Sequence, residues 1–212
     1  MGRVCFSRRR FVGQSSLFLA VCAFSACSRE GNRPLADTSA SSSNLSKSQQ
    51  LTPTPTCGDY GPTPSQTAGP FYSPKSPQRQ SLLTPDVEGT WMVVTGQVLS
   101  VNCEPLANSL VDVWQADARG EYDNTGNKLR GHQFTDAEGR YRIETIVPGV
   151  YPGRTRHLHI KVQPPERSVL TTQLYLPNEP LNEQDFLFQP ALLMAVEETN
   201  EETRAQFDFV IG

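Results

Sequence analysis

Histidine is scarce in this 212-residue chain, which contains only three. Apolar runs are scarce as well: no segment after Leu17–Phe24 is apolar enough to cross a membrane, and Leu17–Phe24 itself is too short to span a bilayer as a helix. The chain also has no basic stripe, and its formal net charge is −3, which argues against a nucleic-acid partner. Helix-length apolar periodicity is missing, apart from a turn expected near Asp185–Phe188.

The N-terminus has the pattern of an export signal. Ser7–Val12 is basic and contains consecutive arginines, the apolar Leu17–Phe24 follows, and Phe24–Cys27 resembles a bacterial lipoprotein cleavage box. Residues 1–27 are therefore predicted to be a twin-arginine-like signal peptide, which typically exports folded, cofactor-loaded proteins. Cys27 is predicted to become the lipidated first residue of an exported, membrane-anchored lipoprotein. An ordinary signal peptide cut nearby is the alternative, and the membrane would be contacted only through this anchor.

Residues 28–56 are predicted to form a disordered tether, because they are rich in Ser, Thr, Asn, Gln and Pro and lack apolar periodicity. Residues 57–212 then have the size of one domain. This domain keeps two cysteines, Cys57 and Cys103, and in an exported protein such a pair favours a disulfide. Two unrelated thiols are the alternative.

The predicted domain is all-β, because its apolar residues alternate over short segments separated by turn residues. One such turn is Asp136–Gly139, a hairpin signal. Strands at this spacing indicate an antiparallel β-sandwich, or a barrel, with long loops that carry the functional site. Trp91 is expected in the core, Tyr141 either in the core or on the strand surface, and Trp114 is expected to pack near the site. The expected strands are Trp91–Leu99, Leu110–Gln115, Tyr141–Ile146, Thr171–Leu176 and Gln206–Ile211.

A candidate metal site follows from His157 and His159, which are two residues apart on a strand pattern and therefore share a face. Imidazoles suit zinc, copper or iron. Tyr151, just upstream, would add a hard anionic phenolate, which favours an oxidised, trivalent metal. A zinc site of three histidines would need His132 and leave Tyr151 without a role. A second tyrosine completes the ligand set better, and Tyr122 stands out because it follows a strand that exits into a loop.

Several motifs resemble those of the intradiol ring-cleavage dioxygenases, in particular the protocatechuate 3,4-dioxygenase branch. The resemblance covers roughly residues 62–211. Its motifs are specific in combination, whereas His-x-His alone would be weak. They are Val113–Asp117 through Gly120–Tyr122, Leu129–Gly131, Thr135–Asp136 through Gly139–Tyr141, Pro148–Gly149 through Tyr151–Pro152, and the entry segment Thr67–Tyr72.

The resemblance implies a mononuclear non-haem Fe(III) held by Tyr122, Tyr151, His157 and His159. It further implies that Tyr151 acts in catalysis, together with Arg154 and Gln173. The substrates would be a small catecholic aromatic and O2, and the product a cis,cis-muconate-type diacid.

The chain departs from the family in two places. It lacks the N-terminal helical segment of the catechol 1,2-dioxygenase branch, and the stretch between Tyr151 and Arg154 is shorter than in protocatechuate enzymes. The second departure bears on the shape of the substrate pocket. A non-catalytic cell-surface β-sandwich binding module is the alternative function. The sequence leaves open which catechol is bound and is compatible with a homo-oligomer.

Overall fold

A computed structural model describes residues 61–199 and 202–212. All of the described residues lie in one compact unit, Leu51–Gly212. The predicted signal peptide, the tether and Cys57 lie outside the described residues, so the disulfide stays a prediction; Cys103 is exposed. Among the described residues, no helix has the length and apolar character needed to cross a membrane.

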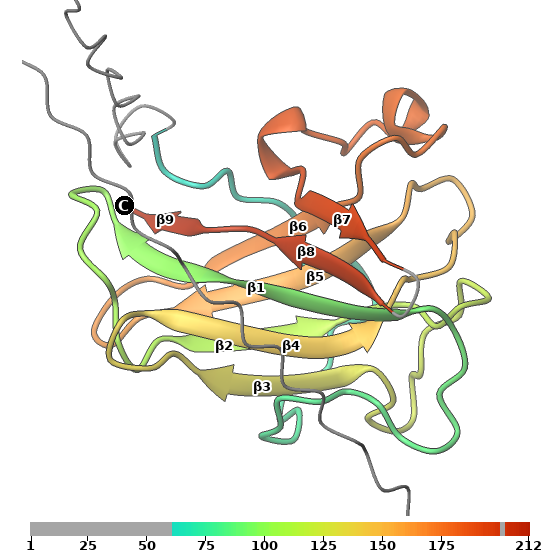
Figure 1. Cartoon of the computed structure of the whole chain (residues 1–212), viewed down its shortest axis with the longest axis horizontal. Helices are drawn as coiled ribbons and strands as arrows, with labels where there is room; N and C mark the ends of the chain where they lie inside the picture. Colours follow the sequence, from blue (N-terminus) through green and yellow to red (C-terminus); the bar gives the residue numbers. More distant parts are fainter. Residues whose placement is uncertain (1–60, 200–201) are drawn as a thin grey trace, which may run out of the picture. The chain divides into compact units, whose positions relative to one another are not determined.

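Two β-sheets form this unit, which confirms the predicted β-sandwich (Figure 1). One sheet has the order β4-β1-β8-β7, with β9 also paired to β1, and the other has the order β3-β2-β5-β6. Pairing is antiparallel except where β8 and β9 run parallel to β1. The elements are β1 (Trp91–Ser100), β2 (Leu110–Trp114), β3 (Arg130–Phe134), β4 (Arg140–Ile146), β5 (His157–Gln163), β6 (Leu170–Tyr175), the 3-10 turns η2 (Asn182–Gln184) and η3 (Pro190–Leu192), β7 (Ala195–Glu198), β8 (Thr203–Gln206) and β9 (Phe209–Ile211).

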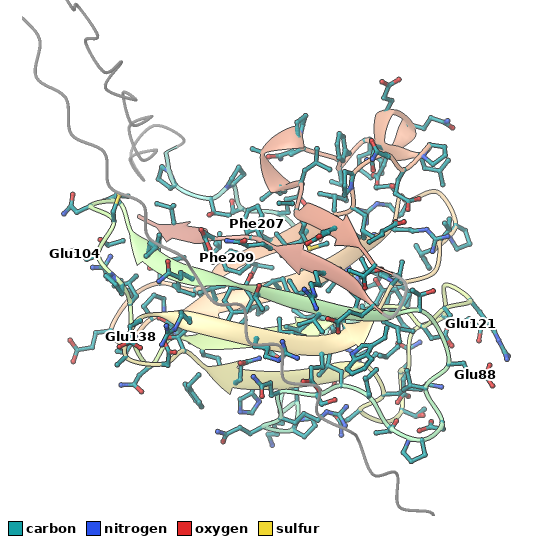
Figure 2. All side chains as sticks on the ribbon, viewed as in Figure 1. Glu88, Glu104, Glu121, Glu138, Phe207 and Phe209 are labelled. Carbon is teal, nitrogen blue, oxygen red and sulfur yellow. The ribbon has the colours of Figure 1, made fainter. Side chains whose placement is uncertain are left out.

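The hydrophobic core is built from alternate residues of the strands, because successive side chains of a strand point to opposite faces. Leu158, Ile160 and Val162 of β5 are fully buried in one apolar cluster with residues of β1, β2, β4 and β6. Phe209 joins this cluster, whereas Glu88, Glu104, Glu121 and Glu138 are exposed and their side chains reach outward (Figure 2).

Several details differ from the sequence predictions. The expected strand Gln206–Ile211 is interrupted at Phe207. The carbonyl of Phe207 passes close to Gly96, and a Cβ on Gly96 would lie 1.8 Å from the Phe207 carbonyl oxygen. Trp91 was predicted to be in the core but is 44% exposed, because it begins β1 at the edge of the apolar cluster. Strands β3, β7 and most of β8 were not expected, because their sequences lack a clear apolar alternation. Tyr141, for which the sequence left core and strand surface both open, is buried.

The face of β5 opposite the core positions the site. His159 pairs with Trp114 of β2 on one side and with Gln173 of β6 on the other, and His157 pairs with Tyr175. These side chains share a face of the β3-β2-β5-β6 sheet that points away from the other sheet. Residues 62–80, here called the N-terminal strap, cover this face and hydrogen bond to it, for example from the Gln66 N–H to the Thr171 carbonyl at 2.7 Å.

Candidate metal centre

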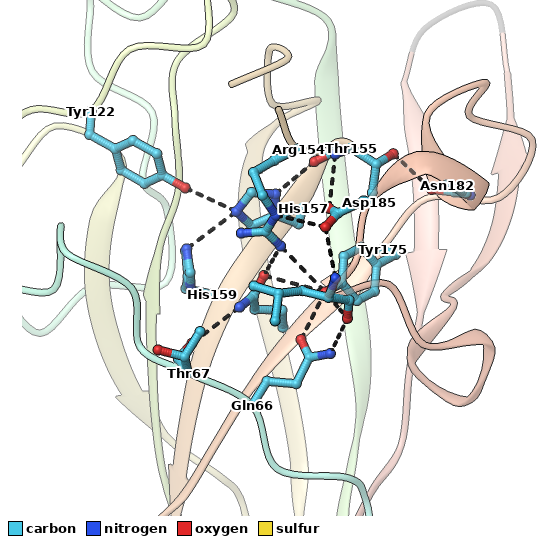
Figure 3. Close-up of polar contacts among 12 residues, drawn as sticks. Gln66, Thr67, Tyr122, Arg154, Thr155, His157, His159, Tyr175, Asn182 and Asp185 are labelled. Carbon is cyan, nitrogen blue, oxygen red and sulfur yellow. Dashed lines mark hydrogen bonds and ion pairs between the residues drawn. The ribbon is translucent and has the colours of Figure 1, made fainter. Parts of the chain in front are cut away.

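The imidazoles of His157 and His159 converge (Figure 3). Their Nε2 atoms are 3.3 Å apart, and the two side chains are almost fully buried. The Nδ1–H of His157 donates to the Thr155 carbonyl at 2.7 Å. Because a carbonyl only accepts, this contact assigns the proton to Nδ1 and leaves a lone pair on Nε2, as in metal-binding histidines.

Burial keeps both imidazoles neutral. It lowers the pKa of His157 to about 4. The hydrogen bond to the Thr155 carbonyl acts in the opposite direction, and the positive charge of Arg154 lowers this pKa further. Burial lowers the pKa of His159 to about 2, with contributions from His157, Arg154 and Arg130. A histidine binds a metal in its neutral form. Both side chains are therefore in the binding form at neutral pH.

Tyr122 brings a phenol to the same point. Its hydroxyl lies 3.3 Å from His157 Nε2, and its ring centroid lies 6.0 Å from that of Tyr151, at 77°. Burial raises the pKa of Tyr122 above its ordinary value, against the lowering effect of Arg154 and Arg130. Without a cation the phenol stays protonated, and a bound multivalent cation would favour the phenolate.

The loops that carry the two tyrosines meet because glycines let their backbones cross. Gly120 has φ +86°, and a Cβ there would lie 2.1 Å from the Val150 carbonyl oxygen. Gly149 approaches the Ala118 and Gly120 backbones in the same way, with its N–H donating to the Asp117 carbonyl at 2.7 Å. These contacts place Tyr151, 29 residues after Tyr122 in the chain, beside it.

Aromatic rings and the strap enclose the site. Phe71 stacks on Tyr122 at 4.5 Å and meets Tyr151 edge-on at 5.4 Å. Trp114 stacks on His159 at 4.9 Å, which confirms its expected packing position. On the strap, a Cβ added to Gly69 would lie 3.2 Å from His159 Cε1. Within the described part of the chain, Trp114 Nε1 and His159 Nδ1 are buried without a hydrogen-bond partner.

Arg154 lies next to the histidines and is held from two directions. Its Nε donates to both carboxylate oxygens of Asp185 at 2.9 Å, and Nη2 donates to Gln173 Oε1 at 2.6 Å. Gln173 in turn donates from Nε2 to the carbonyl of Thr67 in the strap at 3.1 Å. The predicted pair Arg154 and Gln173 is therefore in direct contact.

A second set of contacts ties the strap to the loop after β6. The Tyr175 hydroxyl contacts Gln66 Oε1 at 2.8 Å and the Leu187 carbonyl at 2.9 Å, and Gln66 Nε2 also donates to that carbonyl. Burial raises the pKa of Tyr175 to about 12, so it stays a neutral donor. Together with Arg154, Gln173 and Asp185, these residues form a hydrogen-bonded ring along one wall of the site (Figure 3).

The structure brings all six predicted site residues into one place, and His132 lies elsewhere. His132 pairs with Asp112, which lies two residues before Trp114 on β2. Its ring contacts the Ser76 hydroxyl at 3.1 Å. In residues 61–199 and 202–212, no group of three or more His, Cys, Asp or Glu side chains could hold a metal. A site of the two histidines with His132 or a carboxylate therefore does not form there, and the tyrosines are the remaining donors.

Sequence reasoning missed Phe71 and Asp185 as parts of the site. Phe71 stood in a motif of the resemblance, and only the structure shows it against both tyrosines. Asp185 had been noted only as a turn residue. No local signal marks it, because its partners Arg154 and Thr155 are about 30 residues away in sequence.

Comparisons with known proteins identify relatives of this chain. A family model described as Dioxygenase matches residues 67–211. The chain is 41% identical over 119 residues to a protocatechuate 3,4-dioxygenase beta chain of Burkholderia cepacia, covering 48% of this chain and 51% of that protein. It is 31% identical over 157 residues to a catechol 1,2-dioxygenase of Acinetobacter lwoffii, covering 62% of this chain and 57% of that one. The chain thus spans about half the length of these curated relatives.

Solved structures show the same relationship. The dioxygenase domain of a dioxygenase–carbohydrate-binding protein fusion from Streptomyces sp. SirexAA-E is 53% identical, with a TM-score of 0.69 over 71% of this chain and 97% of that one. A hydroxyquinol 1,2-dioxygenase from Pseudomonas putida DLL-E4 is 25% identical, with a TM-score of 0.64 over 71% and 66%. The matched residues include the histidine strand and both tyrosine loops, and the chain belongs to the intradiol ring-cleavage dioxygenase family.

Proposed function

We propose that this protein is a non-haem Fe(III) dioxygenase that cleaves a catecholic ring between its two hydroxylated carbons with O2, giving a cis,cis-muconate-type diacid. The observation that carries the proposal is the convergence of two neutral imidazoles and a phenol. His157 Nε2 lies 3.3 Å from His159 Nε2 and 3.3 Å from the Tyr122 hydroxyl.

The donor set fits ferric iron. Phenolate oxygen is a hard anionic ligand that stabilises a trivalent metal, and imidazole nitrogen suits iron. The proposed ligands are Tyr122, Tyr151, His157 and His159. The Thr155 carbonyl fixes the tautomer of His157, and Trp114 and Gly69 restrict the ring of His159. A metal here would therefore meet imidazoles whose orientation is already set.

Bound iron would supply Lewis acidity to the substrate oxygens. The chain's own residues would do the rest. Tyr151 is half-buried and directly precedes a turn at Pro152–Gly153. Its phenolic oxygen is our proposed acceptor for one hydroxyl proton of the substrate. The Arg154 guanidinium, held by Gln173 and Asp185, would stabilise negative charge that develops on the ring. Phe71 would exclude water beside the tyrosines.

The proposal is tested by purifying the protein from iron-replete cells and measuring its iron content, its visible spectrum and O2 uptake with catechols. We expect one iron per chain and a red-brown tyrosinate-to-iron charge-transfer band. Tyr122→Phe and His159→Ala should bleach the band. His132→Ala is the matched control, because its ring contacts Ser76 outside the proposed ligand set, and it should keep both iron and colour. A colourless, iron-free wild-type protein would contradict the proposal.

The substrate is proposed only as a catecholic aromatic. The relatives described above are named for protocatechuate, catechol and hydroxyquinol, which differ in their ring substituents. O2 uptake across a panel of these three compounds, with identification of the ring-opened product, would assign the substrate. Cleavage beside rather than between the hydroxylated carbons would contradict the proposed reaction.

We also propose that the protein is exported and anchored through a lipid on Cys27. The support is the basic segment Ser7–Val12, the apolar Leu17–Phe24 and the small residues before Cys27. Fractionation of cells that express wild-type and Cys27→Ala protein tests the anchor. The wild type should sediment with membranes and the variant should not. Equal distribution of both would contradict the anchor.

A further inference from the structure

Asp185 is a buried carboxylate that is saturated with N–H donors. Its side chain is fully buried, whereas that of Arg154 is 12% exposed. Besides the two contacts from Arg154 Nε, Oδ2 accepts from the Thr155 N–H and Oδ1 from the Leu187 N–H, each at 3.0 Å. Burying a carboxylate costs much free energy unless the group is paired and hydrogen bonded. The four N–H contacts offset this cost for Asp185.

These contacts fix the plane of the Arg154 guanidinium. A guanidinium is a rigid planar fork, so anchoring it at two nitrogens sets the direction of the third. Asp185 holds the Nε edge and Gln173 holds Nη2. Within the described residues, no acceptor is recorded for Nη1. The Arg154 side chain thus has one nitrogen available for a ligand, in a direction set by the other two.

The same carboxylate also reaches a histidine. Asp185 Oδ2 accepts the Thr155 N–H, and the Thr155 carbonyl accepts the Nδ1–H of His157. Figure 3 shows Asp185 facing Arg154 and Thr155 from the loop after η2. One side chain therefore constrains both Arg154 and the backbone that orients His157.

We propose that Asp185 is a positioning residue for the reaction: it holds the guanidinium of Arg154 in the orientation that stabilises the anionic substrate. This inference rests on the proposed dioxygenase function. Its rival is a purely structural role, in which Asp185 only holds the loop containing Leu187. The two differ in whether the effect of Asp185 depends on the Arg154 side chain.

A double-mutant cycle on the iron-loaded protein separates them. Asp185→Asn keeps the size of the side chain and removes its charge. We expect kcat to fall on the order of 100-fold, the loss typical of a misplaced catalytic group, with iron content and the charge-transfer band retained. In an Arg154→Ala background the same substitution should lower kcat little further, because the guanidinium that Asp185 positions is gone and an asparagine oxygen can still accept the Thr155 N–H. Additive losses in the two backgrounds would overturn the proposal.

Chemical rescue supplies a second readout that a structural role would not move. Added guanidinium ion should partly restore kcat to Arg154→Ala, because Asp185 and Gln173 still line the vacated place. It should not restore kcat to the double variant. Equal rescue of both proteins would overturn the proposal.

Glu179→Gln is the matched control. It breaks the neighbouring ion pair with Arg156, at 3.2 Å, in the same stretch of chain. It should leave kcat unchanged. A loss as large as that of Asp185→Asn would show that disturbing this segment is sufficient and would overturn the specific role.

Asp185→Glu replaces Asp185→Asn if the latter does not fold. It keeps the charge but moves the carboxylate by one methylene, and we expect reduced kcat with normal iron content; an unchanged kcat would overturn the proposal. Failure of the wild-type protein to bind iron or cleave any catechol would instead reject the proposed function. An active wild type with an additive cycle would reject only the role of Asp185.

Discussion

The two faces of β5 are buried to nearly the same degree by different means. On one face, Leu158, Ile160 and Val162 pack against the second sheet and are fully buried. On the other, His157 and His159 are 4% and 3% exposed, covered by loops and the N-terminal strap. Burial therefore does not distinguish the folding face from the site face. The difference lies in what covers each.

The two coverings have different energetic requirements. Apolar burial is non-directional and contributes roughly 25 cal/mol per Å², so the core tolerates small changes in geometry. The site face buries polar groups, each of which needs a partner at a suitable distance and angle. Its covering accordingly combines aromatic rings with a ring of hydrogen-bonded polar groups. Substitutions on the two faces should have different consequences.

The largest expected effect is on the site face. His157→Ala removes one proposed ligand and should abolish ring cleavage and the charge-transfer band, while circular dichroism still reports a folded β-protein. Iron analysis and O2 uptake with catechol check this. Full activity in this variant would show that the site face has no role in catalysis, and the contrast between the faces would fail.

The next effect belongs to the core face. Ile160→Ala, three residues along the strand, should lower the free energy of unfolding by about 2–5 kcal/mol, because it leaves a cavity between the sheets. Urea unfolding checks the loss. The folded fraction should keep its iron stoichiometry and its kcat. A selective loss of iron at unchanged stability would contradict the separation of roles.

Acid should destabilise the metal-free protein through the site face. The pKa of His157 is about 4 when folded, below its ordinary value of 6.5, so the unfolded chain takes up a proton first as the pH falls. This contribution is complete above pH 6.5 and is lost as the pH falls toward 4. For His157 it amounts to on the order of 2 kcal/mol between pH 6.5 and 5. Thermal melting of the metal-free protein over this range checks the loss. Metal-free His157→Ala should show a shallower pH dependence, and an identical slope would contradict the assignment.

The smallest effect is expected where a polar contact is open to water. Arg140 and Glu138 form an ion pair of 2.7 Å on the sheet that contains β4, with side chains 61% and 58% exposed. Glu138→Gln should change the free energy of unfolding by less than about 1 kcal/mol, because exposed pairs are screened. Denaturant unfolding of this variant beside Asp185→Asn measures the contrast. Equal losses would show that burial of the ion pair is irrelevant.

Local pattern predicted much of the fold. Alternation located β1, β4 and β5, because their apolar residues face one core. It could not show that β8 and β9 pair parallel to β1, since strand direction after a long connection depends on tertiary packing. It also failed at Trp91, which fits the alternating pattern of β1 but lies where the core no longer covers the strand.

The site was predictable where its residues lie close in sequence or belong to motifs of the resemblance. The spacing of His157 and His159 on a strand implied a shared face, and the resemblance added Arg154 and Gln173. Asp185 was out of reach, because its contacts exist only after β6 has paired with β5 and the chain has turned back at η2. Its role in the wall of the site is a product of tertiary structure.

The hydrogen-bonded ring also has a consequence for protein synthesis. The strap is translated before its partners: Thr67 and Gln173 are separated by 106 residues, and Gln66 and Leu187 by 121. At about 5–20 residues per second, the ribosome needs several seconds to reach the second member of each pair. A nascent chain that stops before Leu187 has a strap with no complete wall to close against. The hydrogen-bonded ring can therefore close only after residues 66–187 have all left the ribosome.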